Sequence, residues 1–326
     1  MSLDYFHEMK EMVRCVELYY THQKQQREIA QELEISPSKV SRLLKRAYDE
    51  GFIQVDFNFP SLPRLAAHLI EKKSLRDAVV IPAGVPEEIK EDIGRAAGRY
   101  FERIASPGVR VGISCGFTLY YMIKHLREGR ISDIKIYPLA SEGSLRSADI
   151  LPNTLVGMMA AKYRPKVTAY VLPTYLTGSS GGIKSGSDIW SDPEVKEVCD
   201  AANNVDVALI GVGAVDPDTP GFCALAYAGG LNRQQITSLG AVGEFNYQPL
   251  GPDGEAITDT LVGDFVKKAG TVSLKRLREM SVEHGKTVIA IGGGKEKLAA
   301  IGAVLKGKLC NVLITDQDVA EALLKE

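Results

Sequence analysis

The chain has 326 residues, of which 45% are hydrophobic and 25% charged, and its formal net charge is −2. This composition is typical of a globular protein with room for two domains, and it excludes a disordered chain or a generally basic protein that coats nucleic acid. We expect neither a membrane span of roughly 20 apolar residues nor an N-terminal signal sequence. Because the five cysteines and five histidines do not follow metal-ligand spacing, we expect a cytoplasmic protein with reduced thiols, no metal and no cofactor.

Residues 26–46 predict two short amphipathic helices joined by a tight turn. Four apolar residues of the second helix share one face: Val40, Leu43, Leu44 and Ala47. Ser36 is a suitable N-cap, and Pro37 is favourable at the first helical position. This pattern is typical of a helix-turn-helix that places its second helix in the DNA major groove. The alternative is an ordinary helical hairpin with a solvated charged face.

The second helix lacks acidic residues between Ser36 and Arg46, so its outer face is predicted to be basic. Recognition helices contact bases with their N-terminal residues, while basic side chains further along neutralise phosphates. We therefore expect operator DNA to be contacted by Ser38, Lys39, Ser41 and Arg42 at base edges and by Lys45 and Arg46 at phosphates.

The domain organisation follows from a change of pattern along the chain. Residues 1–57 are predicted to form the helix-turn-helix domain, in which an earlier helix adds an apolar stripe and residues 52–57 alternate like a short strand that could be a wing. Residues 58–76 contain Pro60 and Pro63 before a short helical segment and are interpreted as a linker. Residues 77–326 form the second domain.

In the second domain, short apolar runs alternate with helical stretches. The predicted strands are 78–82, 109–113, 134–139, 167–172, 205–212, 287–292 and 311–315; the predicted helices are 87–104, 117–128, 151–163, 193–203, 274–284 and 294–306. Strands that are apolar on both faces, each followed by a helix, predict an α/β fold with a Rossmann-like, largely parallel sheet covered on both sides.

Ligands in such sheets bind beyond the carboxyl ends of the strands. The loop 114–118 (Ser114, Cys115, Gly116, Phe117 and Thr118) precedes a helix and is a candidate phosphate cradle, although a glycine-rich turn can serve packing alone. Residues 292–297 repeat the pattern with three glycines and two lysines, for which a flexible turn is the alternative. Residues 173–192 are rich in Gly and Ser and are interpreted as a lid or hinge, or else a disordered surface loop.

Glu244 lies in the segment Gly-Ala-Val-Gly-Glu-Phe-Asn at 240–246. A carboxylate flanked by glycine and apolar residues could accept hydrogen bonds from sugar hydroxyls or act as a base; an exposed loop acid is the alternative.

Taken together, the helix-turn-helix, V-G-I-S-C-G-F-T-L at 111–119, D-V-A-L-I-G-V-G at 206–213, the segment 240–246 and the block 291–316 resemble the sorbitol-operon regulator (SorC) family of bacterial transcription factors. The resemblance extends over essentially the whole chain and is most specific in the last block. It implies a regulator of a carbohydrate-utilisation operon that acts as a homodimer or homotetramer. It also implies a sugar-binding domain similar to sugar-phosphate isomerases and deaminases but without enzymatic activity.

The resemblance also implies roles for residues. Loop 114–118 would hold the phosphate of a sugar effector, Glu244 would meet sugar hydroxyls, and Lys297 rather than Lys295 would meet phosphate or a sugar oxygen. Cys115 and Phe117 depart from the smaller or hydroxylated residues common in such loops. Residues 140–143 lack the lysine that could form a Schiff base in some relatives, so no covalent ligand is expected there; Arg146 could replace the missing charge.

The competing function is an active sugar-phosphate isomerase or deaminase that has gained a DNA-binding domain. Glu244 as a base would favour it. Asp206 and Asp216 lie near predicted strand ends, but the sequence pairs neither of them with a histidine.

Overall fold

The computed structural model describes residues 3–53, 61–86, 88–141, 150–173, 191–215, 233–259, 262–263, 266 and 272–325. The chain forms two compact units, residues 1–58 and residues 59–326.

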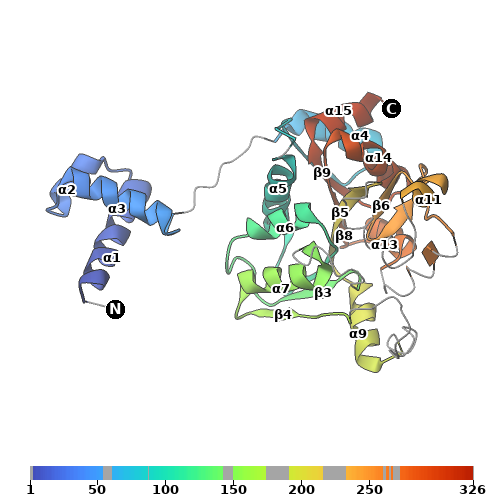
Figure 1. Ribbon diagram of the computed structural model, residues 1–326, viewed down its shortest axis with the longest axis horizontal. Helices are drawn as coiled ribbons and strands as arrows, with labels where there is room; N and C mark the ends of the chain where they lie inside the picture. Colours follow the sequence, from blue (N-terminus) through green and yellow to red (C-terminus); the bar gives the residue numbers. More distant parts are fainter. Residues whose placement is uncertain are drawn as a thin grey trace. The chain divides into compact units, whose positions relative to one another are not determined.

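The smaller unit consists of helices (Figure 1), which pack around one apolar core. Helix α1 (Leu3–Val16) continues into a short π-helix, η1 (Glu17–Thr21), and is followed by α2 (Gln26–Glu32) and α3 (Pro37–Asp49). The core contains Met12, Cys15, Leu18, Ile29, Ala30, Val40, Leu43, Leu44 and Ala47. The Ser36 hydroxyl accepts a hydrogen bond from the Lys39 N–H at 3.2 Å and so caps α3 at its first turn.

The buried face of α3 is the one that helical spacing predicts. After α3, Ile53 donates its N–H to the Ala47 carbonyl at 3.1 Å and packs against the same core. The wing predicted over 52–57 lies mostly outside the described residues, because residues 54–57 are not among them.

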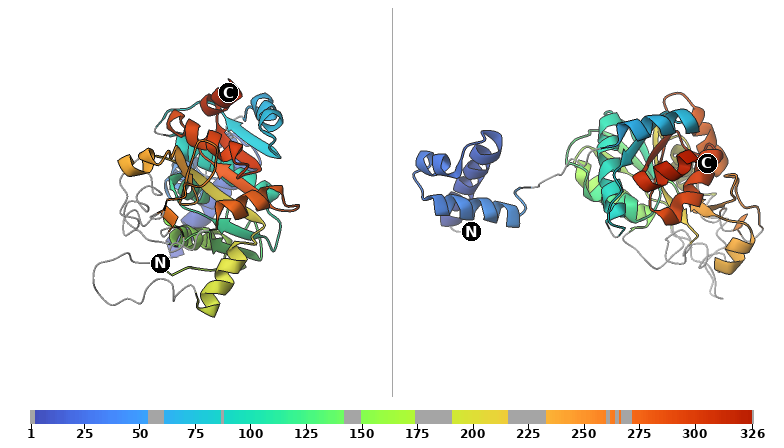
Figure 2. Two further views of the ribbon diagram at one scale, coloured as in Figure 1. Left: turned by 90° about the vertical axis from the view of Figure 1, so that its right-hand side faces the viewer. Right: turned by 90° about the horizontal axis from the view of Figure 1, so that it is seen from above.

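The larger unit contains a mainly parallel sheet. Its strands are β1 (Asp77–Ile81), β2 (Arg110–Ile113), β3 (Ile134–Pro138), β4 (Val167–Ala169), β5 (Val207–Ala214), β8 (Thr287–Ile291) and β9 (Val312–Asp316). Their order across the sheet is β1-β9-β8-β5-β2-β3-β4, and all of these neighbours pair in parallel. Helices lie on both faces, which explains why strands such as β8 and β9 are buried throughout (Figures 1 and 2).

One face of the sheet is covered by α5 (Ile89–Ile104), α6 (Phe117–Lys124) and α7 (Pro152–Tyr163), whose apolar residues share a core with Ile113 and Ile136. The other face is covered by α4 (Pro63–Lys73), α13 (Leu274–Val282), α14 (Leu298–Lys306) and α15 (Gln317–Lys325). Two further helices, α9 (Pro193–Ala202) and α11 (Arg233–Ser238), follow β4 and β5 along the chain. The predicted α/β architecture is confirmed.

The linker prediction is wrong for residues 61–76. Helix α4 buries Ala66 and Leu69 in the core of the larger unit, and the Leu62 N–H donates to the Val80 carbonyl of β1 at 2.8 Å. The two prolines suggested a connector, but Pro63 merely occupies the first turn of α4, where its missing N–H leaves no helical bond unmade.

A small antiparallel hairpin extends the sheet at the carboxyl end of β5. Strand β6 (Gly243–Phe245) pairs with residues 212–214 of β5 and with β7 (Gln248–Leu250). Its two-residue turn, Asn246-Tyr247, has positive φ at both positions (50° and 63°), as hairpin turns matched to strand twist require. The sequence did not predict these strands, and they move Glu244 from an expected loop onto β6.

Candidate functional site

The order of the strands places a switch point between β2 and β5. From β2 the chain continues outward to β3 and β4, whereas β5 adjoins β8 and leads to the opposite edge. Connections that diverge in this way leave a crevice at the carboxyl ends of the two strands, where α/β proteins bind ligands. The loop after β2, the β6 strand beside β5 and the short 3₁₀ helix η3 (Lys295–Lys297) after β8 all lie at these ends. We call this group of elements, in which the sequence predicts effector binding, the candidate effector site.

The loop after β2 leads into an open helix N-terminus. Gly116 has φ +122° and is the N-cap of α6, and among the described residues no side chain caps the helix there. The first N–H groups of an α-helix have no intrahelical partner, so those of Phe117 and the next residues suit an anion. Thr118 is buried with 6% of its surface exposed, whereas Phe117 is 43% exposed.

Two residues of the predicted loop, Ser114 and Cys115, point their side chains into the protein, one in a hydrogen bond and the other in the core. The Ser114 hydroxyl donates to Asn246 Oδ1 at 2.8 Å, so its proton is already used within the protein, and its predicted contact with a phosphate stays a prediction. Cys115 is buried, and its burial, followed by the nearby Glu244 carboxylate, raises the pKa of its thiol well above the usual range. The loop therefore offers backbone N–H groups more than side-chain hydroxyls.

Glu244 is a buried acid with one unsatisfied oxygen. Only 7% of the residue is exposed, and Oε2 has no hydrogen-bond partner among the described residues. Burial raises the pKa of Glu244 to about 7, although the nearby Lys297 and a backbone bond from Tyr247 favour the carboxylate. A buried oxygen without a partner is costly in a native protein, which is a reason to expect a ligand donor there.

The backbone makes room for Glu244 at Gly213 of β5. A Cβ on Gly213 would lie 2.3 Å from Glu244 Oε1, so any side chain there would displace the carboxylate. Sequence reasoning missed this residue, and the only available signal was a glycine near the end of the predicted strand 205–212.

Lys297 is half-buried at the start of α14, and its chain packs near Gly292 at the end of β8. Burial, with the positive charge of Lys90 as the next cause, lowers the pKa of Lys297 to about 8, while Glu296 and Glu244 oppose that shift. Lys295 extends away instead: its side chain is 84% exposed and its Nζ lies 3.3 Å from Asp318 Oδ2. Of the two lysines, Lys297 is the one beside Glu244.

Asn246 is a second residue that sequence reasoning missed. It is 1% exposed, accepts from Ser114, and donates Nδ2 to the carbonyls of Leu139 and Val272 at 3.2 and 3.0 Å. It thereby joins the β6–β7 hairpin to the ends of β2 and β3 and fixes the backbone around Glu244. An Asn after a strand-like run was visible in the sequence, but its partners lie 26 to 132 positions away.

Several predictions fall outside the described residues. These are most of the lid or hinge predicted over 173–192, the second half of residues 140–143, Arg146 and Asp216. Asp206 is described and lies at the amino end of β5, opposite to Glu244. There it accepts hydrogen bonds from the Arg110 side chain and backbone and from Lys286.

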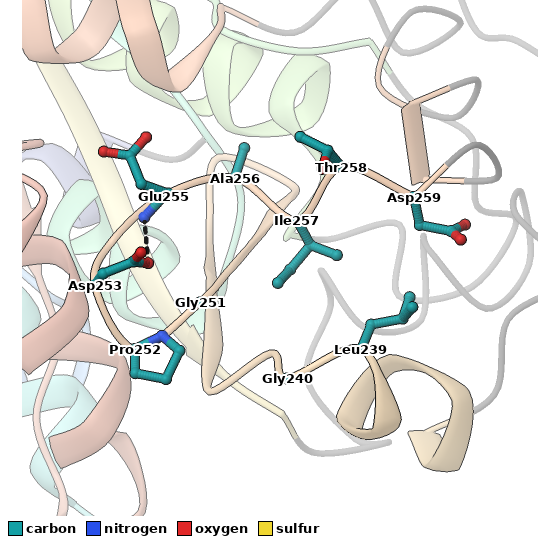
Figure 3. A pocket seen from close by; sticks show the side chains of 10 residues that line it. All are labelled: Leu239, Gly240, Gly251, Pro252, Asp253, Glu255, Ala256, Ile257, Thr258 and Asp259. Carbon is teal, nitrogen blue, oxygen red and sulfur yellow. Dashed lines mark hydrogen bonds between the residues drawn. The ribbon is translucent and has the colours of Figure 1, made fainter.

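A cavity beside the β6–β7 hairpin is separate from these residues. It has a volume of about 430 Å³ and is lined by residues 239–240, 251–253 and 255–259, with the side chain of Ile257 toward Leu239 (Figure 3). None of the residues predicted to bind the effector lines it, and Asp253 Oδ1 accepts the Glu255 N–H at 3.0 Å within the turn.

In the smaller unit, α3 presents a divided basic surface. Ser38, Ser41, Arg42 and Lys45 are exposed. Lys39 and Arg46 are half-buried: Lys39 Nζ lies 2.6 Å from Glu11 Oε2, and Arg46 Nη1 lies 2.8 Å from Glu8 Oε2 of α1. These two residues, seven positions apart, share the flank of α3 that faces α1, so the expected outward orientation of both is wrong.

Among the described residues, no helix is long and apolar enough to cross a membrane. The model of the family described as "Putative sugar-binding domain" matches residues 58–325. The chain is 26% identical over 324 residues to the deoxyribonucleoside regulator of Bacillus subtilis strain 168, covering 96% of this chain and 97% of that protein. It is 27% identical over 321 residues to the transcriptional regulator LsrR of Escherichia coli K12, covering 98% and 95%.

A solved structure with a similar fold is the full-length sorbitol operon regulator SorC from Klebsiella pneumoniae. Its TM-score is 0.66 at 23% identity, and the match covers 98% of this chain and 99% of that one.

Proposed function

We propose, because the chain belongs to the sugar-binding domain family matched over residues 58–325, that it is a transcriptional regulator of a carbohydrate-utilisation operon. The resemblance to the SorC family found in the sequence is confirmed by that match and by the relatives named as transcriptional regulators. The regulator binds operator DNA through its helix-turn-helix unit and a sugar effector through its larger unit. As a DNA-binding regulator it works in the cytoplasm.

One observation supports the effector proposal most strongly: the buried, unpartnered Glu244 Oε2 beside Lys297 and the open N-terminus of α6. A sugar hydroxyl would supply the donor that Glu244 lacks, and a phosphate would take the N–H groups of α6 and the charge of Lys297. A phosphorylated sugar carries both groups in one molecule, so it is the proposed class of effector.

The test is a binding screen of the full-length protein against free and phosphorylated pentoses and hexoses. A ligand at 100 times its dissociation constant stabilises the native state by about 2.7 kcal/mol, which thermal unfolding detects. Saturable binding without turnover is expected. Turnover would favour the isomerase or deaminase. Asp206 could not act together with Glu244 in such an enzyme, because it is held at the amino end of β5, whereas Glu244 lies at the carboxyl end.

Lys297→Ala is expected to abolish the effect of the sugar on operator binding while leaving the affinity for operator DNA unchanged. Lys297 is part of the candidate effector site in the larger unit, whereas the proposed DNA-binding surface belongs to the smaller unit. Fluorescence anisotropy of labelled operator, titrated with the sugar identified by the screen, measures both quantities. Lys295→Ala is the matched control and should respond like the parent, since Lys295 is exposed and paired with Asp318. An unchanged response of Lys297→Ala would place the effector elsewhere.

Regulation requires that the sugar bind the DNA-competent and DNA-incompetent states with different affinity. A coupling of about 1–3 kcal/mol would change operator affinity 5- to 150-fold. We propose that a homodimer or homotetramer, assembled by the larger unit, sets the spacing of the two helix-turn-helix units on the operator.

The fragment 59–326 is expected to fold, to remain oligomeric and to lose operator binding. The reason is that, in the part of the chain that the structure describes, α4 and the strands of the sheet belong to this fragment, and its two main core clusters contain residues of this fragment alone. Size-exclusion chromatography with light scattering gives its mass. A monomeric fragment would show that assembly depends on residues 1–58.

A further inference from the structure

We propose that Lys90 and Phe117 form an outer wall of the candidate effector site, in which Lys90 is a second cation for the anionic group of the effector and Phe117 is an aromatic surface for its ring. This inference rests on the proposed sugar-phosphate effector and adds two specificity-determining residues to its site. Lys90 had no role in the sequence prediction, and Phe117 entered it only as a member of the 114–118 loop.

Helices α5 and α6 bring the two residues together. A Cβ on Gly94 of α5 would lie 2.8 Å from the Thr118 carbonyl oxygen and from the Met122 N–H nitrogen, so the two helix backbones touch. Gly98, one turn later, faces Met122 in the same way, and the helices therefore run parallel. Their N-terminal ends consequently lie side by side, with Lys90 one turn before Gly94.

The side chains of this pair are in contact at the open end of α6. Lys90 Nζ lies 5.9 Å from the centroid of the Phe117 ring, within the range of a cation–π interaction. Phe117 is 43% exposed although it is a large apolar residue, and Lys90 is exposed as well. An exposed ring at the first position of a helix whose N–H groups are uncapped can pack on the carbon face of a sugar bound there.

The charges around the site favour an anionic ligand. Lys90 is close enough to Lys297 for its charge to be the second cause, after burial, of the lowered pKa of Lys297. Glu244 and the exposed Glu296 act in the opposite direction, but burial keeps Glu244 partly protonated near neutral pH. Lys90 lies beside Phe117 at the N-terminus of α6. A phosphate bound to the first N–H groups of α6 would therefore interact favourably with the Lys90 charge as well.

Lys90 also borders a cavity of about 390 Å³ at the carboxyl ends of β1 and β9. Ala83, Gly84, Ile89 and Gly294 line the same cavity, together with Lys295 and the three acidic residues Glu296, Asp316 and Asp318. The buried Asp316 accepts the Gly294 N–H at 2.7 Å.

The experiment compares Lys90→Met with the parent by calorimetric titration of the full-length chain. The probes are ribose 5-phosphate, glucose 6-phosphate, the two unphosphorylated sugars and inorganic phosphate. Lys90→Met is expected to lower the affinity for the phosphorylated probe, the one that the parent binds, by about tenfold. Its affinity for the unphosphorylated sugar should change by less than about twofold, since a charge-assisted hydrogen bond is lost only with the phosphorylated probe. Lys90→Arg should restore most of the affinity.

The matched control is Lys124→Met. Lys124 Nζ lies at the same distance, 5.9 Å, from the Tyr121 ring, but at the opposite end of α6. The Lys124→Met variant should bind every probe with the affinity of the parent.

Phe117→Ser should lower the affinity for the phosphorylated and the unphosphorylated form of the same sugar to the same extent, because the ring is proposed to contact carbon atoms that both forms share.

The outcomes separate this inference from the proposed function. Equal affinity of the parent and Lys90→Met for the phosphorylated probe would overturn the inference and leave the sugar-phosphate effector standing. An equal loss of affinity for the phosphorylated and the free sugar in Lys90→Met would also overturn it, since the substitution would then disturb the folded structure and not a contact with the phosphate. If the parent binds no phosphate-bearing probe, the sugar-phosphate effector itself fails, and this inference fails with it.

Discussion

Glu244→Gln is expected to stabilise the ligand-free protein at pH 8 and to weaken its affinity for the sugar effector. Burial raises the pKa of Glu244 from its ordinary value of 4.5 to about 7. Between these two pH values the folded protein binds a proton that the unfolded chain has released. The contribution of this group to stability is therefore fully present below about pH 4.5 and is lost as the pH rises through about 7.

The size of this effect follows from the shift. A change of about 2.5 pH units corresponds to about 3 kcal/mol, and this is the cost of a buried carboxylate above pH 7. Glutamine has nearly the same shape and no charge, so the variant should gain up to about 3 kcal/mol in free energy of unfolding at pH 8. At pH 4.5 it should match the parent. Affinity for the effector should fall, because a hydrogen bond to a charged acceptor is stronger than one to an amide.

Scanning calorimetry at the two pH values measures this prediction, since it can resolve the transition of each unit. Glu128→Gln is the matched control: its side chain is 82% exposed and lies 4.0 Å from Lys162, so little change is expected at either pH. Equal stability of Glu244→Gln and the parent at pH 8 would mean that the carboxylate has a partner in the ligand-free protein in solution.

Arg42→Ala is expected to remove most of the discrimination between operator and random DNA, whereas Lys45→Ala should weaken both about equally. Arg42 is exposed near the N-terminus of α3, where recognition helices reach base edges, and a good bidentate contact contributes about 1–3 kcal/mol of discrimination. Lys45 is exposed one turn later, where a phosphate contact carries no sequence information.

The measurement is operator affinity and random-DNA affinity at several salt concentrations. Lys45→Ala should also reduce the slope of log affinity against log salt by about one, as loss of one phosphate contact requires. Arg46→Ala is an informative comparison, because Arg46 is bound to Glu8 and Glu50 and should affect the packing of α1 on α3 more than DNA affinity. If both Arg42→Ala and Lys45→Ala lower the affinity for operator and for random DNA equally, the assignment of α3 as the recognition helix is wrong.

Local patterns predicted much of the fold because their causes are local. The buried face of α3 follows from the helical repeat of Val40, Leu43 and Leu44, and its start follows from the hydroxyl of Ser36. The parallel sheet follows from apolar runs that alternate with helices, and strands such as β8 and β9 are indeed buried on both faces. The linker prediction failed for the same reason. Pro63 indicates locally either a break or the start of a helix, but it does not indicate that this helix, α4, packs in the core of the larger unit.

Local patterns along the chain identified the helix-turn-helix, the α/β sheet, the loop with Gly116, the acidic Glu244 and the basic Lys297. The packing of distant segments sets how these groups are used. The β6–β7 hairpin buries Glu244 over Gly213, and Asn246 takes the Ser114 hydroxyl. The approach of α5 to α6 brings Lys90 to Phe117, and α1 pairs with Lys39 and Arg46. The physical reason is that burial, electrostatic interaction and hydrogen-bond satisfaction depend on neighbours far away in the chain, and a local pattern cannot identify those neighbours.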